Sequence, residues 1–254
     1  MIAMPVVTDS ILAVTREYAR LDSCARDRED HPIMPVFDKI LEAARRRVGA
    51  AELQARMPAV STAAALRGVG DDRYLSLMSR RIFRAGLRHS VVDDRWPAFE
   101  QAFRGFDLRR VLAMNDEEIE ALMSDRRLIR HWGKIKSVRS NAAAMQAVAA
   151  EHGGFGAYLA DWPGDDVVGL WGDLGKHFEQ MGGNSGPYFL RMAGKDTFVL
   201  TQSVVAALNH WKAFADTPKT KADRGKVQAV FNAWAGETGL PLAHLSMTLA
   251  ASVD

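Results

Sequence analysis

Residues 181–194 have the sequence MGGNSGPYFLRMAG, in which three glycines, an asparagine, a serine and a proline lead directly into an apolar helical pattern. The preceding stretch 174–181, LGKHFEQM, also has a helical pattern. Pro187 suits the first turn of the helix that follows. The sequence therefore predicts two helices joined by a short hairpin over about 174–194.

A glycine-rich turn of this kind can present backbone N–H groups outward, and the next helix adds the positive end of its dipole. Together these groups form a phosphate site that needs no lysine. The alternative is an ordinary connection between two helices. The residues predicted to bind a DNA phosphate in this turn are Gly183, Asn184, Ser185 and Gly186.

The rest of the chain has mainly helical periodicity. The run 196–208 could be a short strand, or a turn followed by a helix. Asn115 with Glu118 forms a pattern typical of a capping box, and Pro97 suits a first helical turn. We expect an all-α fold whose helices include residues 37–57, 72–92, 96–103, 115–123 and 131–153.

Two polar or Pro/Gly-containing stretches, 58–71 and 215–223, are typical of linkers. They predict an N-terminal helical extension over 1–60 and a main helical domain over 61–254. A closing pair of helices follows the second linker.

The composition limits the class of protein. Of 254 residues 48% are apolar, and the net charge is only +2. Cys24 is the single cysteine, so no internal disulfide can form, which favours a reducing, cytoplasmic location. No basic region followed by a long apolar core opens the chain, and no apolar run approaches the ~20 residues that span a bilayer. We expect no signal peptide and no membrane partner.

Basic residues concentrate in two stretches. Residues 79–95 carry five arginines, and residues 126–139 carry four arginines, two lysines and Trp132. A basic stretch with an aromatic side chain can bind phosphates and stack on a base; alternatively, these side chains only solvate helix faces. Lys134 and Lys136 could contact the same DNA backbone as the glycine turn. The side chains that share one helix face, facing either DNA or solvent, are Arg81, Arg84 and Arg88.

The segment 84–142 resembles the type I DNA-3-methyladenine glycosylases. The family's sequence blocks occur here in the same order, without an insertion. They are Ala85-Gly86-Leu87, Phe106-Asp107, Ala113-Met114 before an acidic helix start at 116–118, Ile129-Arg130-His131-Trp132-Gly133-Lys134-Ile135, and Asn141-Ala142. The resemblance covers roughly 70–210.

The resemblance implies a helix-hairpin-helix DNA glycosylase fold, with helical lobes around a base-binding cleft. It implies a base-excision repair enzyme that flips an alkylated purine of the 3-methyladenine type out of the duplex and hydrolyses its N-glycosidic bond. The expected partner is double-stranded DNA with alkylated bases. We expect a monomer that needs no cofactor.

Several positions depart from the family's pattern. Arg81 stands where the family has a pocket glutamate, and arginine can only donate hydrogen bonds. His89 replaces a tryptophan that stacks on the base, and Thr201 falls where the wider superfamily has a catalytic aspartate. The family's zinc clasp of two cysteines and two histidines cannot form with Cys24 alone, so no metal is expected. A catalytically impaired DNA-binding or lesion-sensing protein on the same scaffold is therefore the alternative.

Four side chains are the base-pocket candidates. His89 could line the pocket or be a core or surface residue, Tyr74 could stack on a base or pack in the core, and Trp132 could lie under the extruded nucleotide. Arg81 is the fourth, by its position in the family's pattern. Trp96 and Trp171 are expected in the core. No catalytic residue is predicted, because the nearby carboxylates have no matching position: Asp71, Asp72, Asp93 and Asp94.

Overall fold

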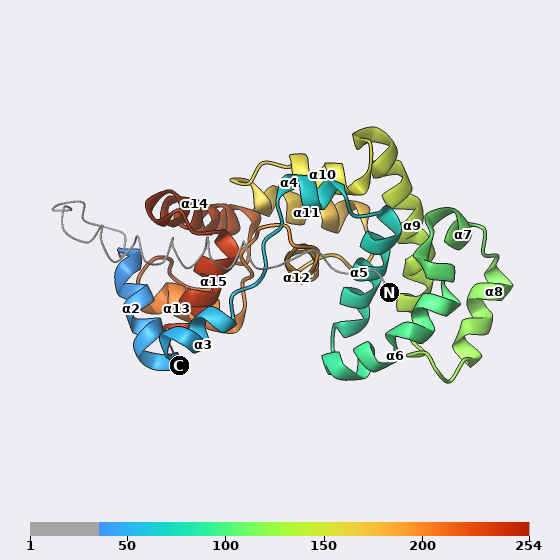
Figure 1. Cartoon of the computed structure of the whole chain (residues 1–254), viewed down its shortest axis with the longest axis horizontal. Helices are drawn as coiled ribbons and strands as arrows, with labels where there is room; N and C mark the ends of the chain where they lie inside the picture. The colour runs from blue at the N-terminus through green and yellow to red at the C-terminus, as the bar shows by residue number, and fades with distance from the viewer. Residues whose placement is uncertain (1–35, 254) are drawn as a thin grey trace. The chain divides into compact units, whose positions relative to one another are not determined.

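The computed structural model describes residues 36–253. All regular secondary structure within this range is helical, so the predicted all-α class is confirmed (Figure 1). No helix in the same range is both long and apolar enough to traverse a bilayer. The chain forms two compact units, one of residues 36–57 with 200–253 and the other of Pro58–Val199.

The first unit contains helices from both ends of the described chain. These are α2 (Phe37–Val48), α3 (Ala50–Ala55), α13 (Gln202–His210), α14 (Lys221–Thr238) and α15 (Leu242–Ala251). α15 contacts α2, α13 and α14. In its core the ring of Phe37 lies 5.5 Å from that of Trp234, and Trp211 Nε1 donates to Ser252 Oγ at 2.8 Å. The run 196–208 thus ends in a helix, and the predicted closing pair forms as α14 and α15.

The division of the chain differs from the sequence-based one. The boundary predicted near residue 60 lies close to the division at 57/58, but a second division at 199/200 joins the C-terminal helices to residues 36–57. Local periodicity shows that a helix has an apolar face. It does not show which distant helix covers that face. Residues 1–35 of the predicted extension, including Cys24, lie outside the described residues.

The second unit is built around α5 (Asp71–Arg84), which contacts helices on several sides (Figure 1). The other helices are α4 (Ala63–Arg67), α6 (His89–Ala102), α7 (Leu108–Leu112), α8 (Asp116–Ala121), α9 (Trp132–His152), α10 (Phe155–Asp161), α11 (Val167–His177) and α12 (Ser185–Ala193), with the short 3-10 helices η1 (Arg104–Phe106) and η2 (Leu122–Ser124). The face of α5 that packs on them is apolar as its spacing predicts, and includes Leu75, Met78, Ile82 and Phe83.

Aromatic rings fill the space between α5, α6 and η1. Phe83 lies 4.5 Å from Phe99, Trp96 stacks on Phe99 at 5.0 Å, and Phe106 stacks on Trp96 at 5.6 Å, all between ring centroids. Each such pair contributes about 0.5–1.5 kcal/mol beyond the burial of its area. Trp96 is buried, as predicted, and so is Trp171. This cluster fixes one side of α5.

Some helix ends agree with the sequence-based prediction and others differ from it. The capping box of Asn115 and Glu118 is confirmed, with both reciprocal hydrogen bonds present at 2.8 and 3.0 Å. The predicted start near Pro97 is wrong, because α6 begins at His89 and contains Pro97 in its interior. The predicted helix 72–92 stops after Arg84, so Leu87 lies outside it and is 41% exposed. The predicted linker 58–71 contains α4, whose position depends on contacts with α10 that local sequence cannot show.

The contact between α4 and α10 depends on Gly156. A Cβ atom at this position would lie 2.3 Å from the backbone carbonyl oxygen of Leu66. We therefore expect Gly156→Ala to lower the free energy of unfolding by about 1–3 kcal/mol, measured by urea denaturation. The matched control is Gly172→Ala on α11, where a Cβ meets no atom within 4 Å; this variant should gain about 0.5–1 kcal/mol from helix propensity. Equal effects of the two changes would contradict the close packing of α4 on α10.

Candidate functional site

The hairpin predicted at 174–194 is present. α11 ends at His177 and α12 begins at Ser185, and the residues between them form a tight turn. Gly183 has a φ of +60°, a conformation that L side chains rarely adopt, and nothing lies within 4 Å of a Cβ placed there. Gly182 and Gly183 are exposed, and their N–H groups donate no hydrogen bond within the described part of the chain. These two amides are therefore available to an external acceptor.

The amides one turn further along have a different role from the one predicted. Ser185 N–H donates to Gly182 O at 3.2 Å, and Gly186 N–H donates to Met181 O at 3.1 Å. Gly186 is also buried, and Pro187 has no N–H. The prediction of outward amides at Ser185 and Gly186 is therefore wrong, because these groups close the turn itself. The open amides lie at Gly182, which the sequence analysis did not name, and at Gly183.

Two side-chain contacts attach the hairpin to α9. The buried Asn141 accepts a hydrogen bond from Glu179 N–H at 2.7 Å and donates to Glu179 O at 3.2 Å. Gln180 Nε2 donates to Gly133 O at 2.8 Å. Asn141 lies in one of the sequence blocks of the resemblance, and the sequence alone predicts no role for it. A buried asparagine in the middle of a helix needs partners outside that helix, which was the available signal.

Arg81 lies on α5 where that helix meets α12. Its guanidinium carbon is 4.7 Å from the ring centroid of Tyr188, and its Nε is buried without a hydrogen-bond partner. Burial lowers the pKa of this guanidinium, and the nearby charge of Arg84 lowers it further. Tyr188, on α12 just beyond the turn, was missed by the sequence analysis, because only the packing of α5 on α12 brings it to Arg81.

The lysines of α9 divide into one buried and one exposed side chain. Lys134 is 8% exposed, and its Nζ donates to Ala85 O at 2.7 Å and to Phe83 O at 3.4 Å. Burial lowers the pKa of Lys134, with a further contribution from Arg81. The prediction that Lys134 contacts DNA is therefore wrong, since its ammonium group caps the end of α5. Lys136 is exposed and remains a predicted phosphate contact.

The aromatic candidates also separate. Tyr74 is fully buried, packs edge-on against Phe155, and donates from its hydroxyl to Leu66 O at 2.7 Å. Burial raises the pKa of Tyr74 to about 12. The prediction that Tyr74 stacks on a base is therefore not supported, since both its ring and its hydroxyl are used in the core. Trp132, at the start of α9, is 43% exposed, and His89, at the start of α6, is exposed.

Two of the carboxylates near α5, Asp93 and Asp71, already have partners. Asp93 accepts hydrogen bonds from Arg84 at 2.6 and 3.0 Å and from Arg80 at 2.9 Å, and these bonds, that of Arg84 first, lower the pKa of Asp93. Asp71 accepts from Phe155 N–H at 2.9 Å. Thr201, at the position of the superfamily's aspartate, caps α13 by accepting from Val204 N–H at 3.1 Å. None of these contacts identifies a catalytic base.

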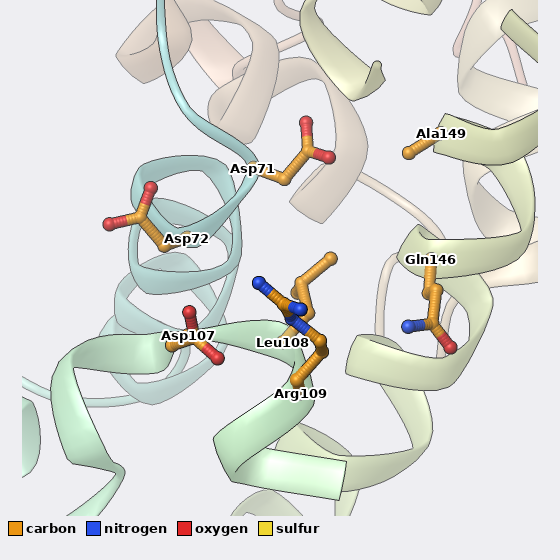
Figure 2. Close-up of a pocket in the computed structure, with 7 residues that line it drawn as sticks. All are labelled: Asp71, Asp72, Asp107, Leu108, Arg109, Gln146 and Ala149. Atoms are coloured by element: carbon orange, nitrogen blue, oxygen red, sulfur yellow. The ribbon is translucent and has the colours of Figure 1, made fainter. Parts of the chain in front are cut away.

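A pocket of about 500 Å³ opens at the N-terminal end of α5 (Figure 2). Arg81 is ten residues further along that helix, or about 15 Å at the standard helical rise. No predicted base-pocket residue lines the pocket, and no cluster of metal-ligating side chains is found within residues 36–253. The lining residues are Asp71, Asp72, Asp107, Leu108, Arg109, Gln146 and Ala149.

Part of this chain is similar in sequence to methyladenine glycosylases. Residues 67–169 match the family described as methyladenine glycosylase. A segment of 61 residues, 24% of this chain, is 38% identical to DNA-3-methyladenine glycosylase 1 of Escherichia coli strain K12, and it spans 33% of that protein's length.

Solved structures of DNA glycosylases are also similar to this chain. A 3-methyladenine DNA glycosylase I from Staphylococcus aureus is 19% identical, with 60% of this chain and 91% of that chain covered and a TM-score of 0.46. The Methanocaldococcus jannaschii 8-oxoguanine glycosylase/lyase, in complex with DNA containing 8-oxoguanine, is 13% identical, with 83% and 93% covered and a TM-score of 0.49.

The segment that matches the family lies within the second unit. It contains α5 and α9, and with them Arg81, Trp132 and Asn141. Residues 67–169 of this chain are thus similar to the methyladenine glycosylases, while the chain spans about a third of the length of the curated relative.

Proposed function

We propose that this protein is a base-excision repair DNA glycosylase that flips an alkylated purine of the 3-methyladenine type out of the duplex and hydrolyses its N-glycosidic bond. The observation that carries this proposal is the family match over residues 67–169. Alkylation makes the purine cationic and a good leaving group, so a shaped pocket and electrostatic stabilisation of the sugar can suffice. The absence of an assigned catalytic carboxylate is compatible with this chemistry.

The exposed hairpin supports the contact with DNA. The open amides of Gly182 and Gly183 would hold a phosphate oxygen, and Asn184 and the hydroxyl of Ser185 are further candidates at the same turn. Trp132, exposed at the start of α9, would stack on a nucleobase. His89 remains a candidate for the wall of the base pocket. The expected partner is double-stranded DNA with alkylated bases, bound by a monomer.

A second candidate function is lesion sensing without bond cleavage. The charges around Arg81 favour it, because a cationic purine would be repelled by that guanidinium and by Lys134 close to it. Asp93, a carboxylate on the neighbouring helix α6, is already paired with Arg80 and Arg84. The two functions share the DNA-binding surface and differ only in whether a base is released.

Base release separates these two functions. We expect the purified protein to release 3-methyladenine from methylated duplex DNA, measured by chromatography of the free bases. Duplex binding is to be measured in the same buffer. Binding without release of any alkylated base would exclude the glycosylase function and leave lesion sensing. Absence of duplex binding even at low salt would exclude both functions, because phosphate contacts strengthen as salt is lowered.

Substitution at the glycine turn tests the phosphate contact. Gly183→Val places a branched side chain on the exposed turn, so duplex affinity should fall about tenfold or more, regardless of base sequence. The matched control is Gly153→Val, because Gly153 is also exposed, has a positive φ of +76° and leaves open space for a Cβ. Both variants should lose similar stability, about 1–2 kcal/mol or more for a side chain in this conformation. Equal DNA affinities of the two variants would identify the turn as a connector only.

The two lysines of α9 provide a second matched pair. Lys136→Gln should weaken duplex binding and reduce its salt dependence by about one phosphate contact. Lys134→Gln removes a buried ammonium group from two carbonyl oxygens, so it should lower the melting temperature without changing the salt dependence. Fluorescence anisotropy at several salt concentrations and thermal unfolding measure the two effects. The reverse pattern would contradict the assignment of Lys134 to the core and Lys136 to the DNA surface.

A further inference from the structure

Arg81 carries a charge that no carboxylate neutralises within the described structure. α5 contains four arginines, and three of them pair with acidic side chains. Arg73 pairs with Glu100 and Asp72, and Arg80 and Arg84 both pair with Asp93. Arg81 makes no hydrogen bond or ion pair to any described residue. Arg81 is therefore the one arginine of α5 without a carboxylate partner among the described residues.

The surroundings of Arg81 raise the free-energy cost of its unpaired charge. Its side chain is half-buried, and the Nε atom is buried without an acceptor. Lys134 is close enough for the charge of Arg81 to lower the pKa of its ammonium group. A buried, unpaired cation costs free energy, and a second cation nearby increases that cost. An anion bound at this point would remove both penalties.

The position of Arg81 is suited to such an anion. The guanidinium lies over the ring of Tyr188, at 4.7 Å from its centroid. The terminal N–H groups of this guanidinium donate to no described residue, so they can bind a pair of oxygen atoms. The terminal nitrogen atoms are not among the buried unpaired atoms, so they reach the surface.

Tyr188 connects this position to the glycine turn. Its N–H donates to Asn184 O at 3.1 Å, in the first turn of α12 directly after Gly182 and Gly183. α12 also contacts α5 through Arg84, whose Nη1 lies 3.8 Å from Met192 Sδ. Tyr188, the residue that Arg81 contacts, thus follows the two open amides within about one turn of helix along the chain.

We propose that Arg81, stacked on Tyr188, is a second phosphate-binding subsite that holds a phosphodiester group of the DNA strand bound by the glycine turn. This inference rests on the DNA-binding part of the proposed function and not on base excision. A phosphodiester is favoured over the edge of a base because it supplies the negative charge that the site lacks, in a two-oxygen geometry that fits a guanidinium. Arg81 then contributes to affinity for any duplex rather than to the choice of base.

The test compares Arg81→Gln with Arg80→Gln, which removes an equal charge from a guanidinium that already has a carboxylate partner. Binding of an undamaged duplex is measured by anisotropy between low and moderate salt. We expect Arg81→Gln to weaken binding roughly tenfold and to reduce the slope of log affinity against log salt by about 0.9, the value for one phosphate contact. Arg80→Gln should change the slope much less. Arg81→Lys, which keeps the charge, should restore most of the slope.

The melting temperature of each variant is measured as a control for loss of the fold. Arg81→Gln should leave the melting temperature unchanged or raise it, because it removes an unpaired charge. An unchanged slope for Arg81→Gln on undamaged duplex, with an altered choice among released bases, would show that Arg81 contacts the base and would overturn the proposal. Base release by the parent protein is measured in parallel. A parent that binds DNA but releases no base, with the slope change still present, would exclude the glycosylase function and leave the phosphate subsite standing.

Discussion

The paired hydrogen bonds between Asn141 and Glu179 are the constraint on which the candidate site depends. A buried asparagine on α9 satisfies both the N–H and the carbonyl of one backbone residue at the start of the hairpin. These bonds are costly to break because Asn141 is buried and its amide would be left without a partner. The exposed turn at Gly182 and Gly183 is therefore held against a long, well-packed helix, although the turn itself makes few contacts.

Helix α9 also contacts the C-terminal end of α5. Lys134, close to the start of α9, donates to the carbonyl groups of Phe83 and Ala85 where α5 ends. α9 thus fixes the hairpin with Asn141 and the end of α5 with Lys134, within two turns of each other. Arg81 lies on α5 just before the residues that Lys134 contacts, and α12 brings Tyr188 to it. The family match ends at residue 169, before the hairpin, yet Asn141 and Lys134 belong to the matched segment. Helix α9 of the matched segment therefore holds the hairpin in position through Asn141.

Charge balance along α5 distinguishes structural arginines from one that faces a ligand. Helical spacing puts Arg81, Arg84 and Arg88 on one face, and spacing alone does not distinguish DNA contacts from solvated side chains. The structure pairs Arg84 with Asp93 at 2.6 Å, leaves Arg88 exposed, and puts Arg81 over Tyr188 without a carboxylate. A half-buried cation without a counter-ion is unusual, and it is the strongest physical sign of a binding role in this unit.

Features that depend on neighbouring residues could be predicted from the sequence. Helical periodicity predicted the all-α class, the spacing of Asn115 and Glu118 predicted a capping box, and the glycines before Pro187 predicted the hairpin. The blocks over 84–142 carried the resemblance to the methyladenine glycosylases. Tertiary structure alone decided what depends on distant partners. It placed Tyr74 and Lys134 in the core, used the amides of Ser185 and Gly186 to close the turn, brought Tyr188 to Arg81, and joined the C-terminal helices to residues 36–57. The reason is that local patterns report the conformation of a few successive residues, whereas burial and pairing are set by side chains that meet only when the helices pack.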